Sequence, residues 1–356
     1  MNRFTWSLKG CVRRLPVGLK DARVNRRWVT KDKRFLVVRH AARQPYYYGG
    51  FLDWVGVNYP DLRRLFELRL LPCRVRDKDQ YLLHIPWLQD PLGDWSPRAY
   101  KQSVKLTADC DRLGIPIVNR VCHHDHATKM EGARRIAQAG LRTPRMTPII
   151  DRPGFQATLC GVETPLIVRE NGGHGGRVYV VKTLADAARI PLKCFRAPIA
   201  VEFIDVQDFQ DRMYRRYRYV VVGDVGVSQG LHVAPNWEAR GSNRLANKAT
   251  RREELAYTSA INPHHAQFVH ARRLLELDIV AFDYSYDSDG RIVVWEANLY
   301  PHWPFSIRSE CQHRLLMSER IYATKLSYYL QRAGCEVPAG LREFGAGDLT
   351  AISGAA

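Results

Sequence analysis

Strand-like apolar runs alternate with helical patterns in the first third of the chain. The pattern predicts strands over 35–38, 81–86 and 115–118, helices over 60–71 and 96–113, and a loop over 46–50. The helix over 96–113 has the clearest ends, because Ser96 suits an N-cap, Pro97 the first helical position and Gly114 the C-terminal stop. This alternation of strands and helices predicts a small α/β domain over residues 35–120.

Strands dominate the pattern in the middle and later part of the chain. The sequence predicts a strand, a glycine-rich loop and a strand over 164–183, single strands over 198–205 and 214–222, a helix over 263–277 and a hairpin over 278–301. A closing helix is predicted over 310–330, and residues 333–356 are predicted to form a tail.

The hairpin carries the most specific polar pattern in the chain. Its two apolar runs are joined by Asp289-Gly290, a strong signal for a two-residue turn. With those residues as the loop, counting back along the strands places Asp283 opposite Glu296. Side chains alternate along a strand, so Asn298 shares the face of Glu296. Two carboxylates and an amide oxygen suit a hard cation such as Mg²⁺; the alternative is a solvated acidic face.

A lysine begins the helix that is predicted to end at Gly140. Thr128 and Glu131 have the spacing of a capping box, so Lys129 falls in the first turn, where a cation opposes the helix macrodipole. A phosphate facing both the lysine and the helix N-terminus would explain this placement; a surface lysine is the alternative. The preceding cluster over 122–126 is contiguous and lacks a second ligand pair at a zinc-like interval, which disfavours a zinc site.

Three further segments offer groups that could bind an anion. The glycine-rich loop would let backbone N–H groups approach phosphate oxygens, although a mobile hairpin tip without a ligand explains it equally well. Arg216 and Arg218 share one face of the strand over 214–222, which indicates that this face lines a cleft. The polar loop over 236–244 adds Arg240, Asn243 and Arg244.

The formal net charge of +18 is concentrated near the N-terminus. Residues 1–34 hold eleven Lys or Arg and two Asp, which is half of the excess. This segment is predicted to be a basic N-terminal extension, either flexible or docked on the surface, with a nucleic-acid-binding arm as an alternative. The remaining excess is compatible with polyphosphate or acidic substrates.

Composition places the chain among soluble globular proteins of two or three domains. Its 356 residues are 46% apolar and 25% charged, and no apolar run is long enough for a membrane span. The eight cysteines form no C-x-x-C pair, which predicts a reducing, cytoplasmic compartment.

The order of these segments resembles the ATP-grasp superfamily over residues 115–330. HATKMEGARRIAQAGLRTPRM is similar to the segment that opens that fold with a nucleotide-binding lysine, and DIVAFDYSYDSDGRIVVWEANLYP is similar to its metal hairpin. The likeness is strongest to the peptide-ligase branch that includes D-alanine–D-alanine ligase and ribosomal-protein glutamate ligase. It implies an α/β (α+β) ATP-grasp domain over 121–332, with a lid subdomain over 142–205, after a pre-ATP-grasp α/β domain over 35–120.

The resemblance also implies roles for individual residues. Those implied to contact ATP, through its phosphates, adenine or ribose, are Lys129, Arg169, Gly172, Gly173, His174, Gly175, Gly176, Glu202, Phe203, Ile204, Asp205 and Asp208. Arg218, Arg240 and Asn243 are implied to act at the transferring phosphoryl group. Asp283, Glu296 and Asn298 would hold one or two Mg²⁺ ions, with Mn²⁺ as an alternative.

The implied reaction joins a small-molecule or peptide carboxylate to an amine through an acyl phosphate, releasing ADP and phosphate. Three departures from the family bear on the substrates. Arg169 replaces the usual second phosphate lysine, Ala281 stands where D-alanine ligases have arginine, and the bulky run from Pro301 to Phe305 indicates an unusual acceptor. An ATP-grasp phosphotransferase and a basic nucleic-acid-associated protein are the alternatives, and the sequence leaves the oligomeric state open.

Overall fold

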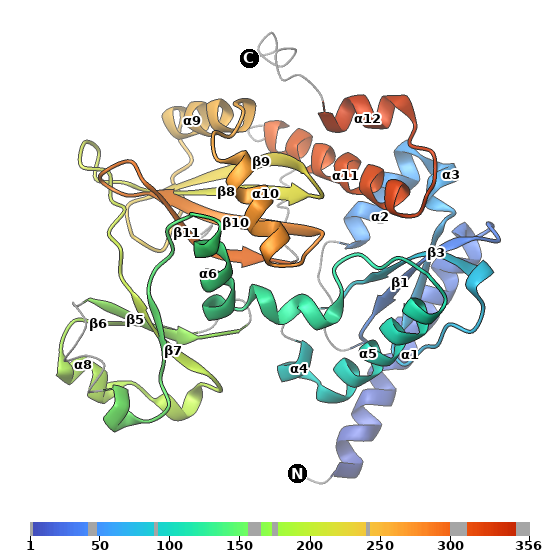
Figure 1. Ribbon diagram of the computed structural model, residues 1–356, viewed down its shortest axis with the longest axis horizontal. Coiled ribbons are helices and arrows are strands. Elements are labelled where there is room, and N and C mark those ends of the chain that lie inside the picture. Colours follow the sequence, from blue (N-terminus) through green and yellow to red (C-terminus); the bar gives the residue numbers. More distant parts are fainter. Residues whose placement is uncertain are drawn as a thin grey trace.

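Three β-sheets and the helices around them make up the described part of the chain (Figure 1). In the computed structural model of the protein, the described residues are 3–41, 48–88, 92–155, 165–172, 177–239, 243–299 and 312–346. The fold is of mixed α/β type, as the sequence predicts.

The first sheet is parallel, with strand order β2-β1-β3. Its elements are β1 (Arg34–Arg39), α2 (Tyr48–Asn58), α3 (Pro60–Arg63), β2 (Phe66–Leu70), η1 (Lys78–Gln80), β3 (Tyr81–Pro86), α4 (Leu92–Trp95) and α5 (Pro97–Arg112). The predicted ends of α5 are confirmed: the Ser96 hydroxyl accepts a hydrogen bond from the Ala99 N–H, and Gly114 has a φ of +67°.

Three predictions in this sheet are wrong. Tyr48 to Gly50 begin α2 rather than a loop, because Tyr48, Phe51 and Val55 give that segment a fully buried helical face. The second half of the expected helix over 60–71 is strand β2, because parallel pairing with β1 overrides the helical spacing of its leucines. Residues 115–118 make only a single bridge, between Ile117 and His84.

Helix α1 (Arg3–Trp28) covers the outer edge of β2 with its C-terminal half. The Asn25 amide donates to the Leu68 carbonyl at 2.8 Å and accepts from the Leu68 N–H at 2.9 Å. Asp21 forms an ion pair with Arg39 at the end of β1. The Asn25 bonds satisfy the backbone groups of Leu68 in an edge strand, so this part of the basic segment is docked on the first sheet.

The second sheet is antiparallel, with order β4-β7-β5-β6, and lies apart from the others in Figure 1. Its elements are β4 (Met146–Pro148), β5 (Leu166–Glu170), β6 (Val178–Val181), α8 (Leu184–Arg189), η3 (Leu192–Cys194) and β7 (Pro198–Glu202). We call it the lid sheet. One of its faces buries a core against α8, and the other carries a second, smaller apolar group.

The third, central sheet is antiparallel, with order β11-β10-β8-β9. Its elements are η2 (Val121–Ala127), α6 (Lys129–Gln138), β8 (Tyr214–Val222), β9 (Val225–Ala234), α9 (Lys248–Ser259), α10 (His265–Leu274), β10 (Ile279–Tyr286), β11 (Ile292–Asn298), α11 (Gln312–Arg332) and α12 (Ala339–Ala346). Tyr219 and Phe282 pack on Phe268 of α10. On the opposite face, Val220 and Ala281 belong to a core shared with α11 and the first sheet.

Residues 333–346 are not the predicted tail. Val337 and Leu341, the latter in the first turn of α12, are buried in the core that α11 shares with the first sheet. The sequence pattern missed this segment because only one turn of apolar residues enters the core. None of the helices in the described part of the chain combines the length and apolar character that a membrane span needs.

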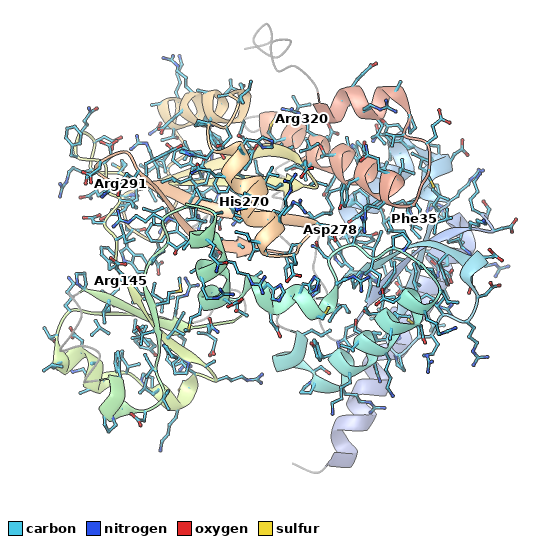
Figure 2. The ribbon with its side chains drawn as sticks, viewed as in Figure 1. Phe35, Arg145, His270, Asp278, Arg291 and Arg320 are labelled. Atoms are coloured by element: carbon cyan, nitrogen blue, oxygen red, sulfur yellow. The ribbon has the colours of Figure 1, made fainter. Side chains whose placement is uncertain are left out.

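Asp278 joins the base of the β10–β11 hairpin to Asn119, which lies just after the bridge between Ile117 and His84 of β3. Its backbone N–H donates to the Asn119 side chain at 2.8 Å, and its carboxylate accepts from the Asn119 N–H at 2.7 Å and from the Tyr328 hydroxyl at 2.6 Å. Asn119 has a φ of +55°, which an asparagine tolerates better than most side chains. Asp278 and Arg291, labelled in Figure 2, mark the base and the tip of the hairpin.

Lys325 of α11 is buried in the core that links the small and central sheets. Its side chain is 2% exposed, and its Nζ lies 4.5 Å from the centroid of the Trp87 ring and 5.2 Å from that of Phe51. Burial lowers the pKa of Lys325 to about 7, while the two ring faces favour its ammonium form.

We expect the free energy of unfolding to rise with pH between about 7 and 10.5, because the unfolded chain there binds a proton at Lys325 that the folded chain lacks. Urea unfolding across this window should show a smaller rise for Lys325→Met than for the native chain. Lys101→Met, at an exposed position of α5, is the control and should keep the native slope. Identical slopes in all three proteins would contradict the assignment.

Candidate functional site

The β10–β11 hairpin brings the predicted metal ligands together. Asp283 lies opposite Glu296 and Ala281 opposite Asn298, as the sequence predicts. The predicted two-residue turn is wrong: the Asp287 N–H donates to the Arg291 carbonyl, which leaves a three-residue loop over 288–290. The register shifts by one residue between Asp283 and Tyr284. This β-bulge compensates for the longer loop, so that Asp283 still pairs with Glu296.

Arg218 neutralises Asp283 from the neighbouring strand. The two residues are opposite one another in the β8–β10 register. The guanidinium donates to both carboxylate oxygens, at 2.5 Å from Nε to Oδ1 and 2.7 Å from Nη2 to Oδ2. Because the Asp283 side chain is 1% exposed, this charge-assisted, two-bonded pair is largely shielded from water.

Glu296 is the point at which the hairpin, α6 and the lid sheet meet. Lys129 Nζ, in the first turn of α6, lies 3.7 Å from Glu296 Oε2. Arg169 Nη2, from strand β5 of the lid sheet, lies 4.0 Å from the same oxygen. The structure therefore places two predicted phosphate-binding cations beside a predicted metal ligand.

The donor set around Asn298 fits a hard cation. Asn298 Nδ2 lies 3.4 Å from Asp283 Oδ2 and 3.3 Å from Glu296 Oε1, so the amide sits between the two carboxylates. A half-turn of the amide would replace its nitrogen by its oxygen and present three oxygens to one point. That is the set of ligands that Mg²⁺ prefers.

The N-terminus of α6 is capped from the lid sheet. Asn171, which follows β5, accepts the Met130 N–H on its side chain at 2.9 Å and the Lys129 N–H on its carbonyl at 3.0 Å. These two backbone donors would otherwise lack a partner within the helix. The lid sheet and the lysine that opens α6 are thus held together by a single residue.

The predicted capping box at this helix is wrong. The Thr128 hydroxyl donates to the Asp125 carbonyl at 2.8 Å and caps no N–H of α6. The Glu131 carboxylate instead accepts from Arg134 and Arg135 at 2.6 Å. Asn171 fills the place that the sequence pattern assigned to Thr128.

An apolar wall lies on the face of the lid sheet that is turned toward α6. Its buried members, Ile167, Ile199 and Val201, are packed by Met130 and Met146 and by the pair Phe203–Trp237. The Phe203 and Trp237 rings meet edge to face, with centroids 5.9 Å apart. Phe203 and Ile204 were implied by the resemblance, whereas Trp237 was missed because it lies in a loop far away in sequence.

The acids at the end of β7 and just after it all have partners within the protein. Glu202 Oε2 accepts from the Arg145 N–H at 2.8 Å. Asp205 accepts from the Gln207 N–H, and Asp208 lies 3.5 Å from Arg215. Neither aspartate is marked out by its contacts as a ribose ligand.

Several predicted residues lie outside the described part of the chain. They are Gly173, His174, Gly175, Gly176, Arg240 and the run over 301–305. Two of their neighbours are described: Gly172 follows the capping residue Asn171, and Asn243 Nδ2 donates to Asn236 Oδ1 at 2.5 Å.

A buried carboxylate that the sequence pattern does not predict organises arginines beside this site. Glu254 of α9 is 0% exposed and accepts from Arg244, after β9, and from Arg314, at the start of α11, both at 2.7 Å. The sequence does carry one signal for this carboxylate, a polar stripe along α9. Thr250, Glu254 and Thr258 are spaced by four residues, and all are buried on one side of the helix.

Comparison with solved structures identifies the architecture. The sequence matches no protein-family model and no curated protein. The structure is similar to a RimK domain protein ATP-grasp from Sphaerobacter thermophilus (TM-score 0.52, 16% identity, covering 83% of this chain and 99% of that one). It is also similar to the VanG D-Ala:D-Ser ligase from Enterococcus faecalis (0.53, 12%, 85% and 100%). The chain has the ATP-grasp fold.

A third structure of this fold is that of the ATP-grasp ligase PsnB complexed with minimal precursor, Mg and ADP. It is 15% identical, with a TM-score of 0.50, and the match covers 82% of this chain and 98% of that one. The predicted ATP-grasp fold is therefore confirmed.

In this ATP-grasp chain, Asn171→Ala should remove the side-chain cap of α6 and destabilise the protein by about 1 kcal/mol. Hydrogen exchange should become faster at Met130 and in the lid sheet, because the bond that joins them is lost. Asn247→Ala removes a similar cap from α9 and is the control, since the Asn247 side chain accepts the Thr250 N–H of that helix and has no contact with the lid sheet among the bonds of the described residues. Faster exchange of the lid sheet in both variants would disprove a specific link between Asn171 and the lid.

Proposed function

We propose that this protein is an ATP-dependent ligase that joins a carboxylate to an amine through an acyl phosphate, releasing ADP and phosphate. The observation that carries the proposal is the convergence of Asp283, Glu296 and Asn298 on one face of a hairpin, with Lys129 and Arg218 beside them. A cation-binding oxygen set next to fixed positive charges suits the phosphates of a nucleotide.

Mg²⁺ and ATP fit these residues. Asp283, Glu296 and Asn298 would hold the metal, and Lys129 and Arg169 would bind phosphate oxygens. The bound metal would neutralise charge on the phosphates and on the transferring phosphoryl group. The PsnB structure of the same fold contains Mg and ADP, which supports this choice of cofactors.

The apolar wall of the lid sheet suits the adenine end of the nucleotide. Phe203 and Trp237 stand beside Met130, which directly follows Lys129, so an adenine ring against this wall would lie next to the phosphate-binding cations. Gly172 to Gly176 would cover the phosphates, and a closed lid would keep water from hydrolysing the acyl phosphate.

The proposed chemistry needs charge neutralisation more than it needs a proton-transfer residue. A carboxylate oxygen of the substrate attacks the γ-phosphorus and the bond to ADP breaks. The amine then attacks the acyl carbon, the bond to phosphate breaks, and the nitrogen loses a proton. Arg218 would support the phosphoryl group in the first step, with Arg240 and Asn243 closing on it.

ADP release, screened across amino acids and small peptides as acid and amine, tests the proposal when the products are identified by mass spectrometry. An amide product formed together with ADP is the expected result. A stable phosphorylated acid, formed equally well without an amine, would replace the ligase by a phosphotransferase. ATP turnover with neither product would reject both.

Glu296→Gln and Asp283→Asn should each lower ADP release by roughly a hundredfold or more, because each removes a charged metal ligand without changing its shape. For Glu296→Gln, circular dichroism and the unfolding midpoint should remain close to those of the native chain. Asp283→Asn should keep the native spectrum but lower the unfolding midpoint, because Arg218 loses its buried carboxylate partner. Asp289→Asn, at the exposed tip of the same hairpin, is the matched control and should keep native turnover. Undiminished ADP release in both site variants would sink the metal assignment.

Trp237→Ala should weaken ATP binding by roughly tenfold, as expected for the loss of an aromatic surface beside a base. Trp237→Phe keeps an aromatic ring and should retain most of the affinity. Equilibrium titration with ATP and Mg²⁺ measures both variants. Equal affinity in the alanine and phenylalanine proteins would place the adenine elsewhere.

A further inference from the structure

Guanidinium groups gather around strands β8 and β9, next to the strand that carries Asp283. Within the central sheet, Arg218 lies opposite Gly230 and Arg216 opposite His232, in the register of β8 and β9. Arg216 and Arg218 are two residues apart with no bulge between them, so they share one face of the sheet. Arg216 thus stands next to the residue that neutralises Asp283.

Glu254 fixes two more arginines next to this pair. Its carboxylate accepts from Arg244 and Arg314, and it also accepts from the Leu231 N–H at 3.2 Å. A Cβ on Gly230 would lie 3.1 Å from Glu254 Oε1, which shows how closely the carboxylate approaches the strand beside Arg218. One buried carboxylate therefore holds two guanidinium groups.

His232 is neutral and adds no charge to the group. Burial first, and then the nearby Arg216, Arg218 and Arg244, lower the pKa of His232 to about 3. A guanidinium can only donate, so the 3.3 Å contact from Arg216 Nη2 requires a free lone pair on His232 Nδ1. The neutral imidazole orients Arg216 and leaves its charge in place.

The group carries more positive charge than it can balance. Among the residues that the structure describes, Arg216 has no carboxylate within ion-pair distance, and its one recorded partner is His232. Arg244 and Arg314 share Glu254, while the carboxylate of Asp283 is engaged by Arg218. Arg216, Arg244 and Arg314 thus carry three positive charges against the one carboxylate of Glu254, and their repulsion would be relieved by an anion bound between them.

We propose that Arg216, Arg244 and Arg314 form a subsite for a second anionic group on the acid substrate. The inference rests on the proposed function, in which the first carboxylate is activated beside Arg218. Two residues along a strand span about 7 Å, so the second group lies within about that distance of the first. The substrate is then of the glutamate or acidic-peptide type, or carries a phosphate in the same place.

Two matched pairs of probes test the subsite: L-glutamate against L-glutamine, and O-phospho-L-serine against L-serine. Calorimetric titration of the full chain, with and without saturating Mg-ADP, gives the affinity for each. We expect one anionic probe to bind about tenfold more tightly than its neutral partner, as for a charge-assisted hydrogen bond. The better of the two anionic probes shows whether the group is a carboxylate or a phosphate.

Arg216→Gln should abolish this discrimination while affinity for glutamine and for Mg-ADP stays native. Arg216→Lys should retain part of it, since the charge remains without the planar donors. Arg252→Gln removes the same charge from the exposed side of α9 and is the control. Equal binding of anionic and neutral probes by the native chain, or equal losses in the Arg216 and Arg252 glutamine variants, would overturn the proposal.

The parallel titration with Mg-ADP separates this inference from the proposed function. A chain that binds neither Mg-ADP nor ATP is not a nucleotide-dependent ligase, whatever the amino-acid probes do. A chain that binds Mg-ADP but not the anionic probes keeps the nucleotide site and lacks the subsite.

Discussion

One extra residue in strand β11 decides where the acids of the candidate site point. From the hairpin loop to Tyr284 the strands pair in one register, and from Asp283 onward they pair in a register shifted by one. Without the bulge, Glu296 and Asn298 would face the apolar core around Phe268 and Phe282. With it, they face the side of Asp283 and Arg218. Burying two more polar side chains in that core would be strongly unfavourable, so the bulge serves stability as well as geometry.

The bulge produces a sheet face that is polarised across its strands. The acids stand on β10 and β11, Arg216 and Arg218 stand on β8, and the pair Asp283–Arg218 lies at the boundary. Each acid at the boundary has a cation within reach, so the face is tolerable without a ligand. A metal-bound polyphosphate would compete for both partners of these pairs at once. The arginine side of the face keeps an excess of charge, which is why the proposed anionic subsite lies there.

Much of this fold and part of the site could be predicted from the sequence, and the errors have physical causes. The hairpin, the arginine strand and the ends of α5 depend on neighbours in sequence, and they were predicted correctly. The pairing of Asp283 with Glu296 was also predicted, although through a two-residue turn that the structure replaces by a longer loop and a bulge. Strand β2 was misread because parallel pairing is a tertiary effect. Glu254, Trp237 and Asn171 act on groups far away in sequence, and no local pattern reports such contacts.

The contact of Asn171 with α6 links the position of the lid sheet to the helical turn that carries Lys129. Asn171 ends β5, caps α6 and precedes Gly172, so a displacement of the lid sheet must carry this cap along or break it. Lys129 stands on the capped turn, 3.7 Å from Glu296, and Arg169 on β5 reaches the same carboxylate. An open lid would therefore withdraw Arg169 and loosen Lys129 together. In the proposed ligase, the positive charge for the phosphates would therefore be complete only with the lid sheet in the position described here, where it would also exclude water.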